Sequence, residues 1–296
     1  MRSDSNPILA ENRRFLTGLI GAPIKHSASP AMHERAAAAL GVHCHYQLIE
    51  VAGAGAEELR LLLEGVKRIG FSGFNVTFPY KEAVVPLLDE LSPRAAAIGA
   101  VNAVVVRGGR LIGYNTDTSG FALAIGDLIT RSRDGAVALI GAGGAGRAIA
   151  FALSELGVAE LHIFDADRAK AEALASRLPG NQKVRIADGV EAALRDVVGV
   201  INATPIGMLP SRASPVPEAL LHRGLWVIDA VYSPLWTPLL IAARAKGATV
   251  MTGRDLAIHQ AADAFELFTG LRPSITEMAR AFDAVTAPGG SVGDAA

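Results

Sequence analysis

Short apolar runs alternate along this chain with longer segments in which apolar positions recur at helical spacing. In the first series, strand-like runs at 15–21, 43–51 and 71–78 enclose helical segments at about 29–40 and 55–69. Strands that alternate with helices are typical of α/β architecture with a largely parallel sheet.

The run at 100–115 departs from this alternation, because apolar residues lie on both sides of Gly108 and Gly109 and predict a β-hairpin that turns there. A linking helix near 118–131 follows. A second series then begins, with strand-like runs and helical segments at 136–141, 144–156, 160–165, 168–178, 197–202 and 225–232.

The two series predict two α/β domains, which we place at 1–117 and 118–253, with a cleft between them. Helices at 254–285 follow the second domain in the sequence, and the pattern leaves open whether they pack on the first. The tail at 286–296 is rich in glycine and other small residues, and we expect it to be disordered.

Composition narrows the functional classes. The chain of 296 residues carries a net charge of −1, so charge gives no argument for a nucleic-acid partner or an anionic membrane. No apolar run reaches the roughly 20 residues of a bilayer helix. Residues 1–12 are polar and lack the apolar core of a secretory signal. We therefore expect a soluble, cytoplasmic protein.

The sole cysteine, Cys44, also fits a reducing compartment. It lies between His43 and His45, which share one face of a predicted strand at a spacing that suits a metal. No further ligand lies close in sequence. An ordinary polar strand face is the favoured interpretation, and we expect no metal.

Lys81 conflicts with its surroundings. In NVTFPYKEAVVPLL, at 75–88, a strand-like run and a proline precede it, at a point where a helix is expected to begin. A cation is mildly unfavourable there, because the helix dipole and the free N–H groups prefer an acceptor. Lys81 is therefore a candidate for a functional role.

A glycine-rich loop follows the strand-like run at 136–141 and leads into a helix. In dinucleotide-binding loops the first glycine permits a tight turn, the second lets the backbone approach a pyrophosphate, and the third lets helix and strand pack closely. Asp165 ends the next strand, where it can accept hydrogen bonds from ribose hydroxyls. A turn used only for packing is the alternative. We predict a dinucleotide site on Gly141, Ala142, Gly143, Gly144, Ala145, Gly146 and Asp165.

A series of motifs, in a fixed order, resembles the shikimate dehydrogenase family over about residues 13–285, and most closely its quinate/shikimate dehydrogenase branch. The resemblance implies an N-terminal substrate domain for a cyclic carboxylic acid and a Rossmann-type domain for a nicotinamide dinucleotide. The motifs are GAPIKHSASPAMH (21–33), NVTFPYK (75–81), GAVNAV (99–104), GYNTDTSG (113–120), NATPIGM (202–208), DAVYSPLWTPLL (229–240) and HQAADAFELFTG (259–270).

The same resemblance assigns roles to single residues. It implies that Ser27 and Ser29 hold the substrate carboxylate, which suits two hydroxyls near the start of a helix. For Ser29 alone, a helix cap is the alternative. The remaining assignments are Thr77, Asn102, Tyr232 and Gln260 for the substrate, and Arg168, Thr204, Ala230 and Gly253 for the cofactor.

Lys81 and Asp117 are implied to be the catalytic pair. A lysine is normally an ammonium ion at neutral pH, so Lys81 is suited to donate a proton when a ketone is reduced. In the oxidative direction it must first pass a proton to water or to Asp117. Which of the two is the formal base stays open.

Two positions depart from the family pattern. Ala103 follows Asn102 where the family usually has a threonine, which leaves the ring preference open. The segment GRDLAIHQ, at 253–260, replaces the usual Met-Leu pair and resembles the NAD-linked branch. Asp165 also favours NAD, because its carboxylate repels a 2′-phosphate, although Arg168 can partly neutralise that phosphate.

We therefore expect an oxidoreductase that uses NAD, with NADP less favoured, to oxidise the C3 hydroxyl of shikimate and of quinate. The alternatives are an NADPH-linked biosynthetic enzyme that reduces 3-dehydroshikimate and a non-catalytic sensor of a shikimate-pathway metabolite. We expect small-molecule substrates and no nucleic-acid or membrane partner, and the sequence leaves a homodimer open.

Overall fold

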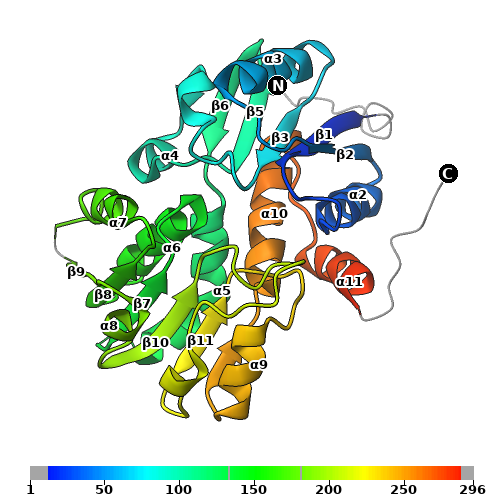
Figure 1. Cartoon of the computed structure of the whole chain (residues 1–296). Helices are drawn as coiled ribbons and strands as arrows, with labels where there is room; N and C mark the ends of the chain where they lie inside the picture. Colours follow the sequence, from blue (N-terminus) through cyan, green and yellow to red (C-terminus); the bar gives the residue numbers. More distant parts are fainter. Residues whose placement is uncertain (1–12, 133, 181, 288–296) are drawn as a thin grey trace, which may run out of the picture. The chain divides into compact units, whose positions relative to one another are not determined.

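The computed structural model describes residues 13–132, 134–180 and 182–287 (Figure 1). The N-terminal segment at 1–12 and most of the expected tail lie outside the described residues. The described chain divides into two compact units, the first built from residues up to 96, from 101–116 and from 261 onwards, the second from 97–100 and 117–260.

The first unit contains a mixed six-stranded sheet in the order β2-β1-β3-β5-β6-β4. β1 is parallel to β2 and β3, whereas β5 is antiparallel to β3 and β6. The predicted hairpin at Gly108 and Gly109 is confirmed, and it makes this sheet less parallel than expected. The strands are β1 (Arg14–Gly21), β2 (His43–Glu50), β3 (Gly73–Val76), β4 (Glu90–Leu91), β5 (Ala103–Arg107) and β6 (Arg110–Tyr114).

Helices cover both faces of this sheet. On one face, α3 (Ala56–Arg68) buries Leu59, Leu63 and Val66 against apolar residues of β1 and β3. On the other face, Ala103 and Val105 of β5 pack with Phe268 of α10 (Arg254–Thr269). Helix α2 (Ser29–Ala39) lies beside α11 (Ile275–Thr286), as Figure 1 shows. A 3₁₀ turn at Val85–Leu87 also belongs to this unit, whereas a short helix, α4 (Pro93–Ile98), begins in it and ends in the second unit.

The second unit contains a fully parallel six-stranded sheet in the order β12-β11-β10-β7-β8-β9. This is the doubly wound arrangement expected of a dinucleotide-binding domain, in which ligands bind beyond the carboxyl ends of the strands. The strands are β7 (Ala136–Ile140), β8 (Glu160–Phe164), β9 (Lys183–Ile186), β10 (Val197–Asn202), β11 (Trp226–Asp229) and β12 (Thr249–Met251).

Alternate residues of the central strand β7 enter two separate cores. Val137 and Leu139 pack with apolar residues of α5, α6 and α7, and Ala138 and Ile140 pack with those of α8 and α9. The sheet is thus covered on both faces, as a parallel sheet requires. The helices are α5 (Asp117–Ser132), α6 (Gly144–Glu155), α7 (Arg168–Ala175), α8 (Val190–Ala193) and α9 (Pro238–Ala245), with a 3₁₀ turn at Glu218–Leu220.

Residues 97–100 interrupt the first unit in sequence and belong to the second. Ile98 and Ala100 are fully buried in the core beneath α5 and α6. Arg177 Nη1 lies 3.3 Å from the carbonyl oxygen of Ala97, and Arg147 Nη1 lies 3.5 Å from that of Gly99. The chain therefore passes from one unit to the other more than once.

Candidate functional site

The predicted substrate residues of the first unit gather at one edge of its sheet. Thr77 follows β3, and the segment that holds Ser27 and Ser29 follows the adjacent parallel strand β1. Asn102 precedes β5, which runs antiparallel to β3 and therefore begins at the same edge. Backbone bonds join the segments: Val76 N donates to the carbonyl of Asn102 at 2.9 Å.

Ser27 and Ser29 lie at the start of α2. Ser29 is the first helical residue and Ala28 is the N-cap, so the alternative that Ser29 caps the helix is wrong. Ser29 is buried, and its N–H donates to Oγ of Ser27 at 3.2 Å. Ser27 Oγ thus occupies the first N–H of α2, Pro30 has none, and Met32 N donates to the carbonyl of Ala28 at 3.1 Å. The two hydroxyls, rather than a set of backbone N–H groups, are therefore the donors that suit an anion here.

Lys81 does not start an α-helix, so that expectation is wrong. Residues 81–84 form turns, with Val84 N bonded to the carbonyl of Tyr80 at 3.0 Å, and only a 3₁₀ turn follows, with Pro86 in it. A proline inside the run removes a donor that a longer helix would need. The backbone of Lys81 is nevertheless fixed, because its carbonyl accepts from Val101 N at 2.8 Å.

Asn102 is buried and lies next to the segment that precedes Asp117. Its Oδ1 accepts from Thr116 N at 2.7 Å, and its Nδ2 donates to Oγ1 of Thr116 at 2.9 Å. Behind it, Asn75 Nδ2 donates to the carbonyl of Asn102 at 2.9 Å, and Tyr46 donates from its hydroxyl to Asn75 Oδ1 at 2.9 Å. The sequence reasoning missed Asn75 and Thr116 as supports, although both lie inside the quoted motifs.

The alanine that replaces the usual threonine does not face this polar chain. Ala103 is fully buried, and it packs with Val105, Ala264 and Phe268 in an apolar cluster on the face of the sheet covered by α10. The substitution therefore keeps a hydroxyl out of an apolar cluster between β5 and α10.

Asp117 and Gln260 belong to the second unit. Asp117 is the buried first residue of α5. Gln260 lies on α10. A Cβ added at Gly120 of α5 would lie 2.7 Å from the backbone nitrogen of Gln260. The two helices therefore approach each other closely near both residues. Lys81 and Asp117 lie in different units, and their pairing stays a prediction.

The glycine loop has the close contacts that its spacing predicts. Gly141 has φ +105°, and a Cβ there would lie 2.9 Å from Cγ2 of Thr204. A Cβ on Gly146 would lie 2.0 Å from the carbonyl oxygen of Gly141. Helix α6 begins at Gly144 with Gly143 as its N-cap, which leaves a backbone cradle of the kind that binds a pyrophosphate.

Asp165 is tied to this loop. Its Oδ2 accepts from Ala142 N at 2.7 Å, and its Oδ1 accepts from Asp167 N at 2.9 Å. The carboxylate is thus held at the carboxyl end of β8 beside the loop. Arg168 is exposed, and its guanidinium binds Glu172, at 2.9 Å from Nε to Oε1, and Asp188.

The other predicted cofactor residues also follow strands of the second sheet. Thr204 comes after β10, Ala230 after β11 and Gly253 after β12. Because these strands and β7 are parallel neighbours, all four loops lie at one edge of the sheet. Tyr232 lies in the loop after β11.

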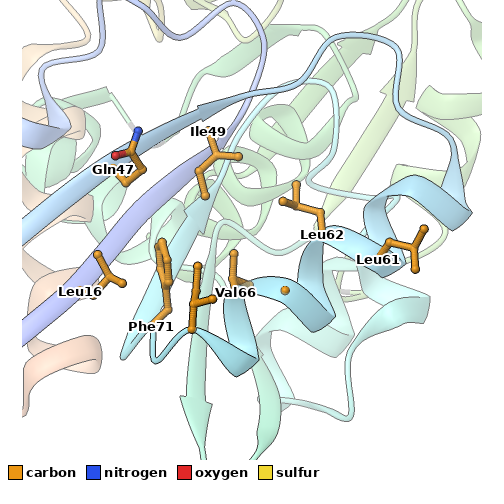
Figure 2. Close-up of a pocket in the computed structure, with 9 residues that line it drawn as sticks. Leu16, Gln47, Ile49, Leu61, Leu62, Val66 and Phe71 are labelled. Carbon is orange, nitrogen blue, oxygen red and sulfur yellow. The ribbon is translucent and has the colours of Figure 1, made fainter.

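Two further features lie apart from the predicted site residues. His45 lies 3.6 Å from Glu34 and 3.3 Å from Gln47, and within the described ranges no group of three or more His, Cys, Asp or Glu side chains could hold a metal. A mainly apolar groove of about 490 Å³ lies between α3 and strands β1 and β2, with Leu16, Ile49, Leu62 and Phe71 among its walls (Figure 2). None of the predicted site residues lines it.

Among the helices of the described chain, none is both long and apolar enough to span a membrane.

Known proteins resemble the chain over nearly its whole length. A shikimate dehydrogenase substrate binding domain matches residues 19–104. A shikimate dehydrogenase (NADP(+)) of Streptomyces avermitilis is 43% identical over 271 residues, which cover 89% of this chain and 93% of the relative. A quinate/shikimate dehydrogenase (NAD(+)) of Corynebacterium glutamicum strain R is 42% identical over 279 residues, covering 92% and 99%.

A solved structure matches as well. The quinate dehydrogenase from Corynebacterium glutamicum in complex with NAD superposes with a TM-score of 0.80 and 40% identity, covering 91% of this chain and 99% of the other. Identity at this level over this length shows common family membership. The two-sheet α/β fold, the glycine loop and the matching relatives agree, and the chain belongs to the shikimate dehydrogenase family of NAD(P)-dependent oxidoreductases.

Proposed function

We propose that this enzyme oxidises the C3 hydroxyl of shikimate, and that of quinate, to the corresponding 3-dehydro ketone with NAD, in a reversible reaction. The observation that carries the proposal is the joint presence of two sites: hydroxyl and amide side chains at one edge of the first sheet, and a glycine cradle in the second unit. Relatives named for both substrates support it.

The residues of the first unit suit a hydroxylated ring acid. Ser27 and Ser29 bind its carboxylate through their hydroxyls, which lie together at the start of α2. Thr77 and Asn102 bind ring hydroxyls, together with Gln260 from α10. Thr116 bonds both polar atoms of the Asn102 amide and Asn75 bonds the Asn102 backbone carbonyl, which favours a fixed orientation of the amide.

Lys81 and Asp117 transfer the proton of the reacting hydroxyl. When bound, NAD supplies a hydride acceptor, so the protein itself needs only to orient the carbinol and to take its proton. Lys81 holds its position through the Val101 bond to its carbonyl, and Asp117 is buried at the start of α5. The lysine ammonium donates the proton in the direction of ketone reduction.

NAD is the proposed cofactor, in preference to NADP. A 2′-phosphate would approach the Asp165 carboxylate, and like charges at about 4 Å repel by about 4 kcal/mol at an effective dielectric of 20. Arg168, the nearby cation that could offset this repulsion, already binds Glu172 and Asp188. These ion pairs are exposed and weak, so we give Asp165 the larger share of the preference.

Initial rates test the proposal. The purified protein is offered shikimate or quinate with NAD or NADP, the reduced nicotinamide is followed by absorbance, and the ketone is identified by mass spectrometry. We expect turnover with shikimate and with quinate, and a higher kcat/KM with NAD. A higher kcat/KM with NADP would instead support the biosynthetic alternative. Binding of shikimate without turnover would support the sensor.

A further inference from the structure

Three buried polar side chains lie side by side at the carboxyl ends of β10 and β11. Asn202 ends β10, Asp229 ends β11 directly beside it, and Thr237 precedes α9. All three are fully buried. They are not among the residues that we assign to the substrate or the cofactor.

Asp229 is the centre of this cluster. Its Oδ1 accepts from Asn202 Nδ2 and from Val231 N, both at 2.9 Å, and its Oδ2 accepts from Thr237 Oγ1 at 2.7 Å. One carboxylate therefore joins the end of β10, the loop after β11 and the first turn of α9.

Asn202 extends the cluster to the loop after β10. Its Oδ1 accepts from N and from Oγ1 of Thr204, at 2.9 and 2.7 Å, and its Nδ2 also donates to the carbonyl of Ile206 at 3.1 Å. Every polar atom of this side chain is thus used to fix residues 204–206.

A contribution to folding stability does not by itself explain why Asp229 is buried in this cluster. Burial raises the pKa of Asp229 to about 6, above its ordinary value of 3.8, and its three hydrogen bonds only partly oppose that change. Burying a carboxylate costs free energy, which hydrogen bonds from neutral donors only partly offset. The structure connects this cost with the three segments that Asp229 holds together.

The loops that the cluster holds in place, after β10 and β11, lie beside the glycine loop and the loop after β12. A Cβ on Gly141 would approach Thr204 and Ala203 at 2.9 to 3.1 Å. A Cβ on Gly253 would lie 2.7 Å from the carbonyl oxygen of Ala230 and 2.9 Å from that of Val231. The loop after β7 thus contacts the loop after β10, and the loop after β12 contacts the loop after β11, while the cluster joins the two pairs.

We infer that Asn202, Asp229 and Thr237 are positioning residues, which lock the loops after β10 and β11 into one rigid wall of the dinucleotide site. This inference rests on the proposed function, because it takes Thr204 and Ala230 to contact the cofactor. None of the three side chains needs to contact the cofactor itself.

Titration of the protein with NAD alone, by calorimetry, tests the inference. Thr237→Val removes the hydroxyl at nearly constant volume, and Thr237→Ser restores it. We expect Thr237→Val to raise the Kd for NAD about tenfold, and Thr237→Ser to stay within about twofold of the parent. Equal affinities for Thr237→Val and the parent would overturn the inference.

A stability control is needed, because Thr237 also caps α9 through Leu240 N at 3.3 Å. Val158→Ala, in the apolar core just before the amino end of β8, lowers Tm at the opposite end of the strands from the cluster. It should leave the Kd for NAD within about twofold of the parent, and a rise as large as that of Thr237→Val would show a general folding effect and overturn the inference.

Asp229→Asn serves as a second variant if Thr237→Val does not fold, because it keeps the volume and one acceptor oxygen. We expect it to raise the Kd for NAD several-fold, and an unchanged Kd would count against the cluster. A parent that binds no dinucleotide would overturn the proposed function and this inference together. A parent that binds NAD while both cluster variants match it would overturn only the inference.

Discussion

At the scale of single residues, Lys81 was singled out in the sequence because a cation is unfavourable at the start of a helix. The structure removes that reason. No helix begins there, so its charge does not oppose a helix dipole. Lys81 lies in the loop after β3, and backbone hydrogen bonds join its carbonyl to Val101, next to Asn102, and its neighbour Tyr80 to Thr77.

Lys81→Ala should lower kcat by about a hundredfold or more, because it removes a proton-transfer group that acts in the transition state. KM for shikimate should change less. Steady-state kinetics measure both quantities. Lys67→Ala, which removes a partly exposed lysine paired with Glu64 on α3, is the matched control and should keep the parent's kcat. A Lys81→Ala enzyme within a few-fold of the parent would show that Lys81 is not catalytic.

Asp165→Asn should raise kcat/KM for NADP at least tenfold, since it removes the repulsion of the 2′-phosphate and leaves Arg168 nearby. Activity with NAD should fall. The kcat/KM values for the two cofactors are compared with those of Asp167→Asn, which makes the same charge change two residues away and keeps a capping side chain on α7. The assignment fails if NADP use does not improve, or if both variants improve it equally.

Residues inside the quoted motifs could be named from the sequence, but their partners could not. Asn75, Asn202 and Thr237 all lie in those motifs, yet their contacts join segments that are distant along the chain, such as Asn75 with Tyr46. A linear pattern carries no information on such contacts. It identifies the neighbourhood of a site and leaves its supports unassigned.

At the scale of elements, apolar periodicity predicted the long helices and central strands well. Helix α2 and the hairpin of β5 and β6 are confirmed nearly as expected. Several short strands were missed, β4 with two residues, β12 with three and β9 with four, because a run of so few positions shows no clear period. Helix α9 was also missed, because it begins at Pro238, inside a motif that starts at the last residue of β11 and continues through a loop.

The end of β11 should give a distinctive pH dependence of stability. The pKa of Asp229 is raised by burial to about 6, so its contribution to stability is complete below about pH 3.8 and is lost as pH rises through 6. Between about pH 5 and 7.5 the parent should therefore lose about 1 kcal/mol relative to Asp229→Asn. Denaturant unfolding of both proteins at several pH values measures this, and parallel pH profiles would contradict the assignment.

The junction of β7 and α6 should tolerate no side chain at Gly146. Gly146→Ala places a Cβ against the carbonyl of Gly141, and it should cost about 1 to 3 kcal/mol of stability and weaken NAD binding. Gly65→Ala is the control, because a Cβ in α3 meets no atom within 4 Å and should stabilise the protein by about 0.5 to 1 kcal/mol. Chemical denaturation and NAD titration measure both effects, and a Gly146→Ala protein that behaves like Gly65→Ala would refute the packing argument.

At the scale of the whole molecule, the α/β class with a Rossmann-type unit was predictable, because strand and helix periods alternate along most of the chain. The way in which the chain divides between the units was not. Residues 97–100 belong to the second unit through Ile98 and Ala100, and α10 runs from one unit into the other. Such crossings depend on tertiary packing, for which a sequence pattern has no local signal.

The central claim is that both units serve one hydride transfer from C3 of a ring acid to NAD. Shikimate that carries deuterium at C3 tests it most directly, with the mass of the reduced cofactor as the measurement. The account predicts NADH heavier by about one mass unit and a ketone product without the label, because the C3 hydrogen leaves as hydride. Unlabelled NADH, or deuterium retained in the product, would contradict it.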